Sequence, residues 1–493
     1  MKLYDLLNQC NNINMPKNTS RDIRHICCDS RIAGPYSIFV CIKGAVTDGH
    51  LYAISAYTNG CRCFVVEDEI QLPKDCDIIF TDNSRDTLAK LSNILYDQPS
   101  KKLKVIGITG TKGKTTTALM ISGILNMLDI PTGYIGSNGI MYKNYHHMSA
   151  NTTPESCDIQ RYLSDMVDAG IKYVIIEVSS QALYLGRVEY IEFDTCIFTN
   201  LSIDHIGEHE HPNFEHYRDC KAKLFTKFHP KRIIVNNDDD HTKYMICKCE
   251  AEAETYGIKT SAQHTACNIK LYKTNNTFGM SFDYLCGNSK YPLTINLPGE
   301  FNISNALAAI TTCSGITGDI EAIIKAIQCV KVPGRFELVP ALPYATIVID
   351  YAHNGVSLRS VLETIRMYNP RRIITLFGSV GSRTKMRRAE LGYIASILSD
   401  HCIITSDNPD TESPFLIIQD IIHAFDPNGC KYDKIEDRKQ AIVYAMSLLG
   451  RGDVLLLAGK GHENYQLISG HKVPFCEREI VVETAKNMQE NFV

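Results

Sequence analysis

No run of about 18 apolar residues occurs in the sequence of 493 residues, and this absence excludes a transmembrane helix. A strong charge of either sign is also missing, because 51 basic residues nearly balance 55 acidic ones and leave a formal net charge of −4. Domains dedicated to nucleic-acid binding are usually strongly basic, so that class is not expected. Residues 1–20 are too polar for the apolar core of a signal peptide, which predicts a cytoplasmic protein.

The chain also lacks paired cysteine motifs, although it contains 19 cysteines. That odd number is spread along the chain, unlike the framework of a disulfide-stabilised protein. None of the close pairs has the two-residue gap of a zinc knuckle or a redox motif; they are Cys27–Cys28, Cys61-x-Cys63 and Cys247-x-Cys249. Reduced, mostly buried thiols are therefore expected.

The composition is that of a globular protein, with 44% hydrophobic and 22% charged residues. At roughly 150 residues per domain, the length predicts about three domains. The polar stretch after Pro99 and the Pro-Gly break within residues 331–337 are the two predicted boundaries. They divide the chain into residues 1–100, 101–333 and 334–493.

Short apolar runs alternate with helical patterns along the chain. The predicted strands lie in residues 38–44, 61–68, 104–110, 173–178, 196–201, 232–237 and in four later runs that each end in a glycine- or aspartate-rich turn. Such alternation predicts an α/β fold with mostly parallel sheets covered by helices on both faces. Residues 267–297 are more polar and are predicted to form an antiparallel insertion. Ligands are expected at the carboxyl ends of the parallel strands.

Residues 107–117, GITGTKGKTTT, follow a predicted strand and precede a helical pattern. Gly110 and Gly113 let the backbone curl and direct N–H groups at phosphate oxygens, and the helix N-terminus adds its positive dipole end. Lys114 would reach the terminal phosphates of a nucleotide, and Thr115 would offer its hydroxyl to Mg²⁺. The loop has one residue more than the usual motif, but the combination still predicts binding of ATP or GTP.

A carboxylate stands at the end of a later buried strand. Glu177 lies near the end of the run YVIIEV, where it suits a hard divalent cation held by oxygen ligands and nucleotide phosphates. Four histidines follow, at positions 205, 209, 211 and 216, without a cysteine pattern or HExxH spacing, so a zinc site is not expected. His205 directly follows Asp204 at a strand end and is the histidine predicted near the metal.

Further motifs follow one another along almost the whole chain: GTKGKTTT, NTTP, EVSSQAL, TNLSIDHI, FNISNALAA, PGRFE, DYAH, SDNP and AGKGHE. Their order resembles that of the Mur ligases, ATP-dependent amide-forming enzymes of bacterial cell-wall synthesis, and specifically the MurE type, which adds the third residue of the peptide stem. The strings DSR, FVCIKG and DGH near the N-terminus are similar to the uridine-nucleotide-binding domain of that type. The resemblance implies a central P-loop sheet flanked by an N-terminal α/β substrate domain and a C-terminal Rossmann-like domain.

The resemblance also implies a reaction in which ATP phosphorylates a substrate carboxylate and an amine attacks the acyl phosphate. Lys114 and Mg²⁺ would neutralise the phosphates. Thr115 and Glu177 would hold one Mg²⁺, and Glu177, His205 and Lys221 would serve a second. In the family the lysine matching Lys221 is carbamylated by CO₂, which turns it into an anionic metal ligand. Judged by residue type alone, Lys221 is an ordinary solvated helix lysine.

The remaining ligand contacts follow from the same resemblance. ATP would be bound by Gly110, Thr111, Gly113, Lys114, Thr115, Thr116, Asn302, Asn305, Arg335 and Asp350. A UDP-N-acetylmuramoyl dipeptide would be held by Ser30 at its uridine end and, at its muramoyl-dipeptide end, by Thr152, Thr153, Ser179 and Arg187. Hydroxyls suit a ligand rich in sugar and amide groups, and an arginine suits a carboxylate or diphosphate. Helix capping is the alternative role for Asn302 and Asn305.

The string Asp407-Asn408-Pro409-Asp410 bears on the identity of the added amino acid. Family members that add meso-diaminopimelate carry an arginine where Asp410 stands, and that arginine clamps the distal carboxylate. Two unit charges about 4 Å apart are worth about 1–4 kcal/mol, so an aspartate would repel that substrate and attract an ammonium group. L-lysine is therefore predicted, and its binding residues would be Arg383, Asp407, Asn408, Asp410 and Glu463. Ornithine fits the same charges, and an Asp410 that faces solvent would leave meso-diaminopimelate open.

Two other functions stay open at this point. A folylpolyglutamate synthetase uses the same chemistry but lacks a uridine-binding domain of the kind that residues 29–50 indicate. A P-loop regulatory NTPase would bind partners and hydrolyse nucleotide without a second substrate. For the ligase, the expected partners are a UDP-N-acetylmuramoyl dipeptide, ATP and a diamino acid, without nucleic acid, and the chain is expected to act as a monomer.

Overall fold

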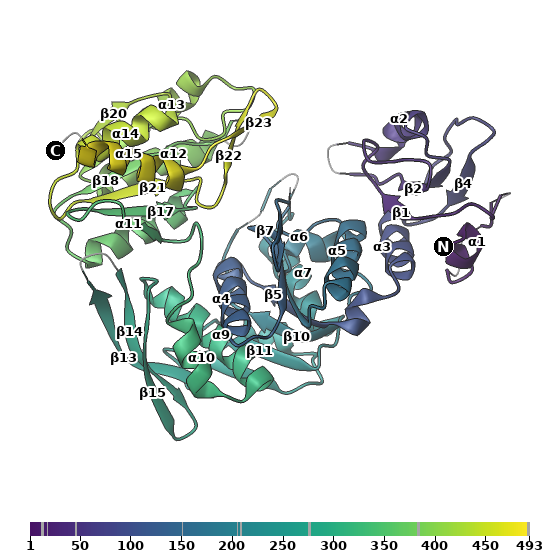
Figure 1. Cartoon of the computed structure of the whole chain (residues 1–493), viewed down its shortest axis with the longest axis horizontal. Helices are drawn as coiled ribbons and strands as arrows, with labels where there is room; N and C mark the ends of the chain where they lie inside the picture. Colours follow the sequence, from purple (N-terminus) through teal and green to yellow (C-terminus); the bar gives the residue numbers. More distant parts are fainter. Residues whose placement is uncertain are drawn as a thin grey trace. The chain divides into compact units, whose positions relative to one another are not determined.

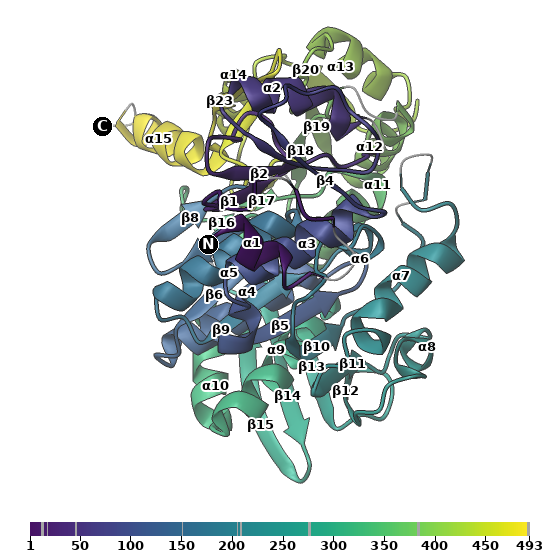
Figure 2. The ribbon, with the colours of Figure 1, turned by 90° about the vertical axis from the view of Figure 1, so that its right-hand side faces the viewer.

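The computed structural model describes the chain except for residues 11–13, 17, 45–46, 150, 205, 208–209, 275–277, 382–384 and 491–493. Its helices and strands are labelled in Figure 1 and seen from a second side in Figure 2. The contacts divide the chain into two compact units. One comprises Met1–Thr265 and Ser304–Ile323, and the other comprises Ala266–Ile303 and Ile324–Val493. The two domain boundaries drawn from the sequence, and the three domains that they separate, stay predictions.

The first unit begins with a four-stranded parallel sheet. Its strands, in sheet order, are β1 (His25–Cys27), β2 (Ser37–Val40), β3 (Cys63–Val66) and β4 (Asp77–Phe80). The accompanying helices are α1 (Leu3–Leu7), α2 (Ala53–Thr58) and α3 (Ser84–Leu95), with the 3-10 turns η1 (Gly49–Tyr52) and η2 (Pro99–Lys102). Every residue of β2 and β3 is buried, because apolar clusters cover both faces of this sheet.

A larger sheet follows, in the order β13-β12-β11-β10-β5-β9-β6-β7-β8, and all of these strands lie in the first unit except β13, which continues into the second from Ala266. Its strands are β5 (Lys104–Thr109), β6 (Thr132–Gly136), β7 (Gly139–Tyr142), β8 (Tyr145–His147), β9 (Tyr173–Glu177), β10 (Phe193–Phe198), β11 (Arg232–Asn236), β12 (Ala253–Gly257) and β13 (His264–Lys273). Pairing is parallel from β6 through β9, β5, β10 and β11 to β12, and antiparallel at the β6–β7–β8 edge. The strands predicted in this part of the chain are confirmed.

Helices cover both faces around β5, the strand that ends in the glycine-rich loop. They are α4 (Lys114–Met127), α5 (Ser156–Asp168), α6 (Ser180–Tyr184), α7 (Phe214–Thr226) and α8 (Thr242–Ile246). Side chains of α5, α6 and α7 join residues of β5 and β9 in one core cluster. Figure 1 shows α4 on the other side of β5, where it packs against β6 and β9. The carboxyl end of β5 therefore lies between helices on both faces.

The second unit contains the antiparallel hairpin of β14 (Phe278–Cys286) and β15 (Ser289–Ile295), which confirms the predicted insertion. A six-stranded sheet has the order β16-β17-β21-β18-β19-β20 and is parallel except at β16. Its strands are β16 (Glu337–Val339), β17 (Thr346–Asp350), β18 (Ile373–Phe377), β19 (His401–Ile404), β20 (Lys431–Lys434) and β21 (Val454–Ala458). A separate small hairpin joins β22 (Tyr465–Ile468) to β23 (His471–Pro474).

Two helical layers enclose this sheet. Apolar side chains of α11 (Gly355–Met367), α12 (Lys385–Leu398) and α13 (Pro414–Ile422) fill one face, and those of α14 (Arg438–Ser447) and α15 (Glu477–Glu490) fill the other. The chain also forms α9 (Glu300–Thr317) and α10 (Ile320–Ile327). The predicted α/β class is confirmed, with a small α/β domain, a P-loop sheet and a Rossmann-like sheet following one another along the chain.

All 19 cysteines are free, and their redox state stays a prediction. Only Cys247 and Cys329 are exposed, while the others are buried or half-buried. In the part of the chain that the structure describes, every helix is too short or too polar to cross a lipid bilayer.

Candidate active site

The loop between β5 and α4 has the shape of a phosphate cradle. Gly110 and Gly113 take φ angles of +151° and +85°, which glycine adopts at little cost. A Cβ at Gly113 would overlap the side-chain oxygen of Asn305. The Lys114 ammonium lies over the loop and donates to the carbonyls of Gly110, at 2.7 Å, and Thr111, at 3.1 Å. The glycine-rich loop and the Lys114 ammonium therefore lie together after β5, and their role toward a nucleotide stays a prediction.

Glu177 is fully buried at the end of β9, and both of its carboxylate oxygens accept hydrogen bonds. The Thr115 hydroxyl donates to Oε2 at 2.9 Å. The Tyr134 hydroxyl and the Ser137 N–H both donate to Oε1, the latter at 3.1 Å. A hydroxyl and a carboxylate beside a phosphate loop are oxygen donors of the kind that Mg²⁺ prefers, so the residues present fit that ion.

Lys221 is brought from α7 to the same loop. Only 1% of its side chain is exposed, and its ammonium donates to the Gly110 carbonyl at 2.8 Å. Its Nζ also lies 4.6 Å from the centroid of the Tyr217 ring. Burial, and then the positive charge of Lys114, lower the pKa of Lys221 well below its ordinary value. His205, the other predicted ligand, lies outside the described residues.

Four residues predicted to hold the dipeptide are gathered near the end of β9. The Thr153 hydroxyl donates to the Glu177 carbonyl at 2.7 Å, and its oxygen lies 3.3 Å from the Ser179 hydroxyl oxygen. Arg187 donates from Nη1 to the Thr153 carbonyl at 3.2 Å. Thr152 lies in the same region, because its hydroxyl oxygen is 3.1 Å from that of Ser137 in the loop after β6. These side chains therefore lie within one network that includes the candidate metal ligand.

Ser30, predicted to contact uridine, lies after β1 in the small N-terminal sheet. It is buried, and its carbonyl accepts a hydrogen bond from the Asn59 amide at 2.8 Å. Its neighbours Asp29 and Arg31 form an exposed ion pair of 2.6 Å. The role of Ser30 toward uridine stays a prediction.

The two asparagines of FNISNALAA have different surroundings. Asn305 accepts from the Thr117 hydroxyl at 3.3 Å and thus contacts the first turn of α4. Asn302 donates to the Pro298 carbonyl at 2.7 Å, a local bond at the start of α9. Asn305 therefore lies beside the glycine-rich loop. The Asn302 side chain instead makes a local hydrogen bond at the start of α9, as the capping alternative predicts.

In the second unit, Arg335 and Asp350 lie at the amino end of β16 and the carboxyl end of β17. Asp350 accepts from the Phe336 N–H at 2.7 Å. Burial raises the pKa of Asp350, and the charge of Arg335 opposes that rise. The guanidinium of Arg335 also lies 4.9 Å from the centroid of the Tyr351 ring.

Three residues predicted to bind the amino acid surround a buried ammonium group. Lys460 is fully buried and donates to Asn408 Oδ1 at 2.8 Å and to Glu463 Oε2 at 2.7 Å. Asp407 Oδ1 lies 3.7 Å from the same nitrogen, and the Asn408 amide donates to Glu463 at 3.0 Å. The cluster lies at the carboxyl ends of β19 and β21, where ligands of parallel sheets bind.

Asp410 has a structural role that its sequence position did not indicate. Its φ angle is +54°, and its Oδ1 accepts from the Gly470 N–H at 2.9 Å. Its backbone exchanges hydrogen bonds with Leu467 and Ser469. One carboxylate oxygen is therefore engaged in the turn between β22 and β23. Arg383, predicted near the α-carboxylate of the substrate, lies outside the described residues.

Sequence reasoning missed Tyr134, Ser137 and Lys460. Tyr134 and Ser137 carry no motif, and only the pairing of β6 with β9 brings them to Glu177. Lys460 stands inside the quoted string AGKGHE, so a signal was present. Glu463 stands three positions later, so the sequence alone could have predicted that the two side chains lie close together. The contact of Lys460 with Asn408 depends on the order of strands in the sheet.

Comparison with known families matches three successive parts of the chain. Residues 22–107 match "Mur ligase family, catalytic domain", residues 108–313 match "Mur ligase middle domain", and residues 334–461 match "Mur ligase, glutamate ligase domain". The chain belongs to the Mur ligase family. It is accordingly an ATP-dependent ligase that forms a peptide bond in peptidoglycan synthesis, rather than a regulatory NTPase.

Individual relatives match this Mur ligase from end to end. The UDP-N-acetylmuramoyl-L-alanyl-D-glutamate–2,6-diaminopimelate ligase of Caldanaerobacter subterraneus subsp. tengcongensis is 39% identical over 483 residues and 98% of each chain. The ligase of the same name from Clostridioides difficile is 37% identical, with 99% of this chain and all of the other covered. A solved structure of a ligase of that name has a TM-score of 0.67 at 25% identity and 99% coverage of both chains. The chain is therefore of the MurE type.

A folylpolyglutamate synthase is a more distant neighbour. The solved enzyme from Mycobacterium tuberculosis with ADP and AMPPCP is 15% identical, covers 81% of this chain and has a TM-score of 0.60. That likeness shows a shared fold alone.

Proposed function

We propose that this enzyme adds meso-2,6-diaminopimelate to UDP-N-acetylmuramoyl-L-alanyl-D-glutamate. The observation that carries the proposal is the match along 94–99% of the chain to eight relatives named for a 2,6-diaminopimelate ligase. The engagement of Asp410 by the Gly470 N–H supports it further. Repulsion of diaminopimelate requires a carboxylate directed at the substrate, and one oxygen of the Asp410 carboxylate is held by the turn between β22 and β23.

L-lysine is the second candidate, and one observation favours it. Asp410 stands in the string SDNPD, where family members that add diaminopimelate carry an arginine. Without that cation, the distal carboxylate of diaminopimelate loses a partner at this position. Asp407 and Glu463 add two further carboxylates to this part of the unit, and both face the buried Lys460 ammonium. Ornithine fits the same charges.

For the phosphoryl step, the phosphate loop and Lys114 would bind and neutralise the phosphates of ATP. Thr115 and Glu177 would hold Mg²⁺, which when bound neutralises charge on the phosphate oxygens. Thr153, Ser179 and Arg187 would hold the dipeptide with its carboxylate toward the loop. The carboxylate attacks the terminal phosphorus, ADP leaves, and the amine of the incoming amino acid then displaces phosphate from the acyl phosphate. We expect these steps in the cytoplasm.

We also propose that Lys221 carries a carbamate. Its neutral amine would attack CO₂, a C–N bond would form, and the nitrogen would lose a proton to leave an anionic carbamate. Burial and the lowered pKa of Lys221 support this step, because the neutral amine is the reactive form. The ammonium groups of Lys221 and Lys114 both donate to the Gly110 carbonyl. Carbamylation would remove the positive charge of Lys221 from this position.

Labelling with ¹³C-bicarbonate tests the carbamate. We expect a carbamate carbon signal that disappears in Lys221→Ala, together with a loss of about 100-fold in activity. Lys223→Ala, on the same helix but only half-buried, is the matched control and should keep both signal and activity. An unmodified Lys221 and a fully active Lys221→Ala enzyme would contradict the proposal.

An amino-acid panel tests the proposed substrate. Purified enzyme with ATP and UDP-N-acetylmuramoyl-L-alanyl-D-glutamate is given meso-diaminopimelate, L-lysine, L-ornithine or no amino acid, and phosphate release and product mass are followed. We expect the highest kcat/KM for meso-diaminopimelate and little phosphate release without an amino acid. A higher kcat/KM for lysine or ornithine would overturn the substrate assignment.

A further inference from the structure

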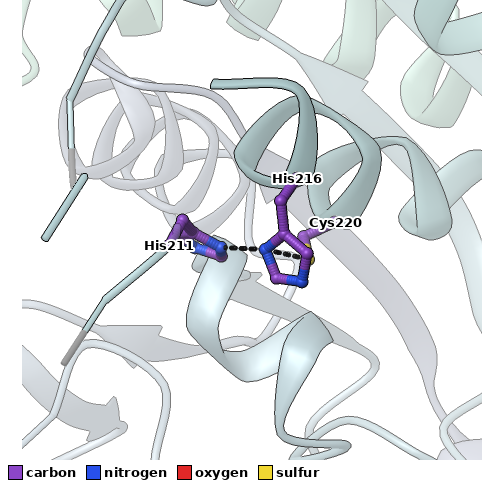
Figure 3. A group of neighbouring side chains, drawn as sticks. All are labelled: His211, His216 and Cys220. Carbon is purple, nitrogen blue, oxygen red and sulfur yellow. Dashed lines mark hydrogen bonds between the residues drawn. The ribbon is translucent and has the colours of Figure 1, made fainter. Parts of the chain in front are cut away.

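Two histidines and a cysteine meet beside α7, and none of the three is among the residues predicted to bind ATP or Mg²⁺. His216 and Cys220 are one helical turn apart and therefore share a face of α7, while His211 comes from the segment before the helix. The Nδ1 atoms of the two histidines lie 2.9 Å apart. Cys220 Sγ lies 3.8 Å from Nδ1 and 4.0 Å from Nε2 of His216. Figure 3 shows the three side chains directed toward one another.

A second contact orients the His211 ring. Its Nε2 lies 2.9 Å from the Ser180 hydroxyl oxygen, at the start of α6. A ring that donates its Nε2 proton to this oxygen keeps a lone pair on Nδ1, and Nδ1 faces His216. Histidines that bind metals usually have such a partner for the second ring nitrogen, because it fixes the tautomer and the ring orientation.

Two of the three side chains are buried, and His216 is half-buried. His211 is fully buried and Cys220 is 1% exposed. The Tyr184 ring packs edge-on against His216 at 4.9 Å between centroids, and the Tyr217 ring packs against His211 at 5.3 Å. A largely buried, aromatic-lined surrounding strengthens the electrostatic attraction between a cation and its ligands.

From these contacts we propose that His211, His216 and Cys220 form a Zn²⁺ site. All three candidate ligand atoms lie within 4.8 Å of one another. Zn–N bonds of about 2.1 Å and Zn–S bonds of about 2.3 Å place tetrahedral ligand atoms about 3.4 and 3.6 Å apart. The thiol contact already approaches that spacing, and the two histidine nitrogens need to separate by about half an ångström.

The proton balance of binding is simple. The thiol of Cys220 releases its proton to solvent, and His216 holds its proton on Nε2 so that Nδ1 can bind the metal; both histidines then ligate as neutral rings. The fourth tetrahedral position is left for water. Two nitrogens and one sulfur form a donor set for zinc or another borderline-soft ion, while Mg²⁺ requires oxygen ligands.

A bound ion would link His211, in the segment before α7, to Cys220 on that helix. Cys220 directly precedes Lys221. It does not depend on which amino acid the enzyme adds, so its test is separate from the amino-acid panel. Cys220 belongs to none of the closely spaced cysteine pairs in the sequence, so local spacing did not indicate zinc here.

Titration with Co²⁺ tests the site in the full-length enzyme, with excess Mg²⁺ present to occupy oxygen ligands. We expect one equivalent of Co²⁺ to produce a thiolate-to-cobalt charge-transfer band and the visible absorption of a tetrahedral centre, both displaced by Zn²⁺. Cys220→Ser should abolish the charge-transfer band and weaken Zn²⁺ binding at least about tenfold. Cys247→Ser, which removes an exposed thiol in the same unit, is the matched control and should leave the spectrum unchanged.

Absence of the thiolate band in the wild-type enzyme, or its loss in Cys247→Ser, would overturn the proposal. Thermal unfolding gives a second measurement that does not need the cobalt spectrum. Zn²⁺ should raise the Tm of the wild-type and Cys247→Ser enzymes, because a ligand that binds the native state stabilises it. An equal rise in Cys220→Ser would show that zinc binds elsewhere.

Discussion

The hydroxyl oxygen of Thr115 lies 2.9 Å from Oε2 of Glu177 and joins the first turn of α4 to the end of β9. Octahedral Mg²⁺ with bonds of about 2.1 Å holds adjacent ligand oxygens about 3.0 Å apart. The two side chains therefore have the spacing that a shared ion needs. The remaining hydrogen bonds of Glu177 hold its carboxylate in that orientation.

Tyr134→Phe should weaken Mg²⁺ binding without removing a metal ligand. Tyr134 is fully buried, and its hydroxyl donates to Glu177 Oε1, so the variant leaves this oxygen to the Ser137 N–H. We expect the Mg²⁺ concentration for half-maximal activity to rise about tenfold. Tyr256→Phe removes another buried hydroxyl, one that bonds the Phe198 carbonyl, and serves as the control. Equal Mg²⁺ requirements in both variants would contradict the orienting role.

Gly113→Ala should impair ATP binding more than backbone strain alone explains. Gly113 has a φ angle of +85°, and a Cβ there would overlap Asn305. Gly170→Ala is a matched control, because Gly170 has a φ angle of +73° and open space around its Cβ position. The strain common to both costs about 1 kcal/mol of stability. We expect a KM for ATP raised at least fivefold in Gly113→Ala and unchanged in Gly170→Ala.

Local sequence signals predicted the phosphate loop because its chemistry is encoded in consecutive residues. A strand, two glycines and Lys114-Thr115 determine where the loop begins and which side chains reach a phosphate. Glu177 was predictable for a similar reason, as a carboxylate near the end of a buried run. Tyr134 was not, because its hydroxyl reaches Glu177 only through the parallel pairing of β6 with β9.

Asp410 shows the limit of reading a residue by its charge. The sequence shows an aspartate in place of an arginine, but it does not show the turn between β22 and β23 that brings the Gly470 N–H to this carboxylate. Sixty residues separate the two partners. Long-range contacts of this kind follow from the arrangement of the helices and strands, and local sequence patterns do not predict them.

Asp410→Asn separates the charge of this side chain from its hydrogen bond. The amide oxygen of asparagine can still accept from the Gly470 N–H, so the turn is retained while the negative charge is lost. We expect the ratio of kcat/KM for meso-diaminopimelate to that for L-lysine to change less than twofold. Asp410→Ala, which loses both properties, should lower the Tm. A tenfold gain for meso-diaminopimelate in Asp410→Asn would show that the charge sets specificity.

Asp453→Asn should destabilise the second unit in a pH-dependent way. Asp453 is buried before β21 and accepts from Arg371 at 2.8 Å, Arg372 at 2.6 Å and the Gly450 N–H at 2.8 Å. Burial raises its pKa, but the hydrogen bonds from both arginines outweigh that effect and lower the pKa to about 2, from an ordinary value of 3.8.

A carboxyl group whose pKa is lowered by folding stabilises the native state above its unfolded pKa, and this contribution disappears as the pH falls through the folded pKa. Asp453 therefore stabilises fully above about pH 4 and loses its contribution between about pH 4 and pH 2. Both guanidinium groups are about half exposed, which weakens the ion pairs. We therefore expect the ionised Asp453 to contribute about 1–2 kcal/mol to the free energy of unfolding at pH 7. Denaturant unfolding of wild type and Asp453→Asn at several pH values measures this difference. The two curves should converge toward pH 2, whereas a constant gap would mean that packing, and not ionisation, accounts for the loss.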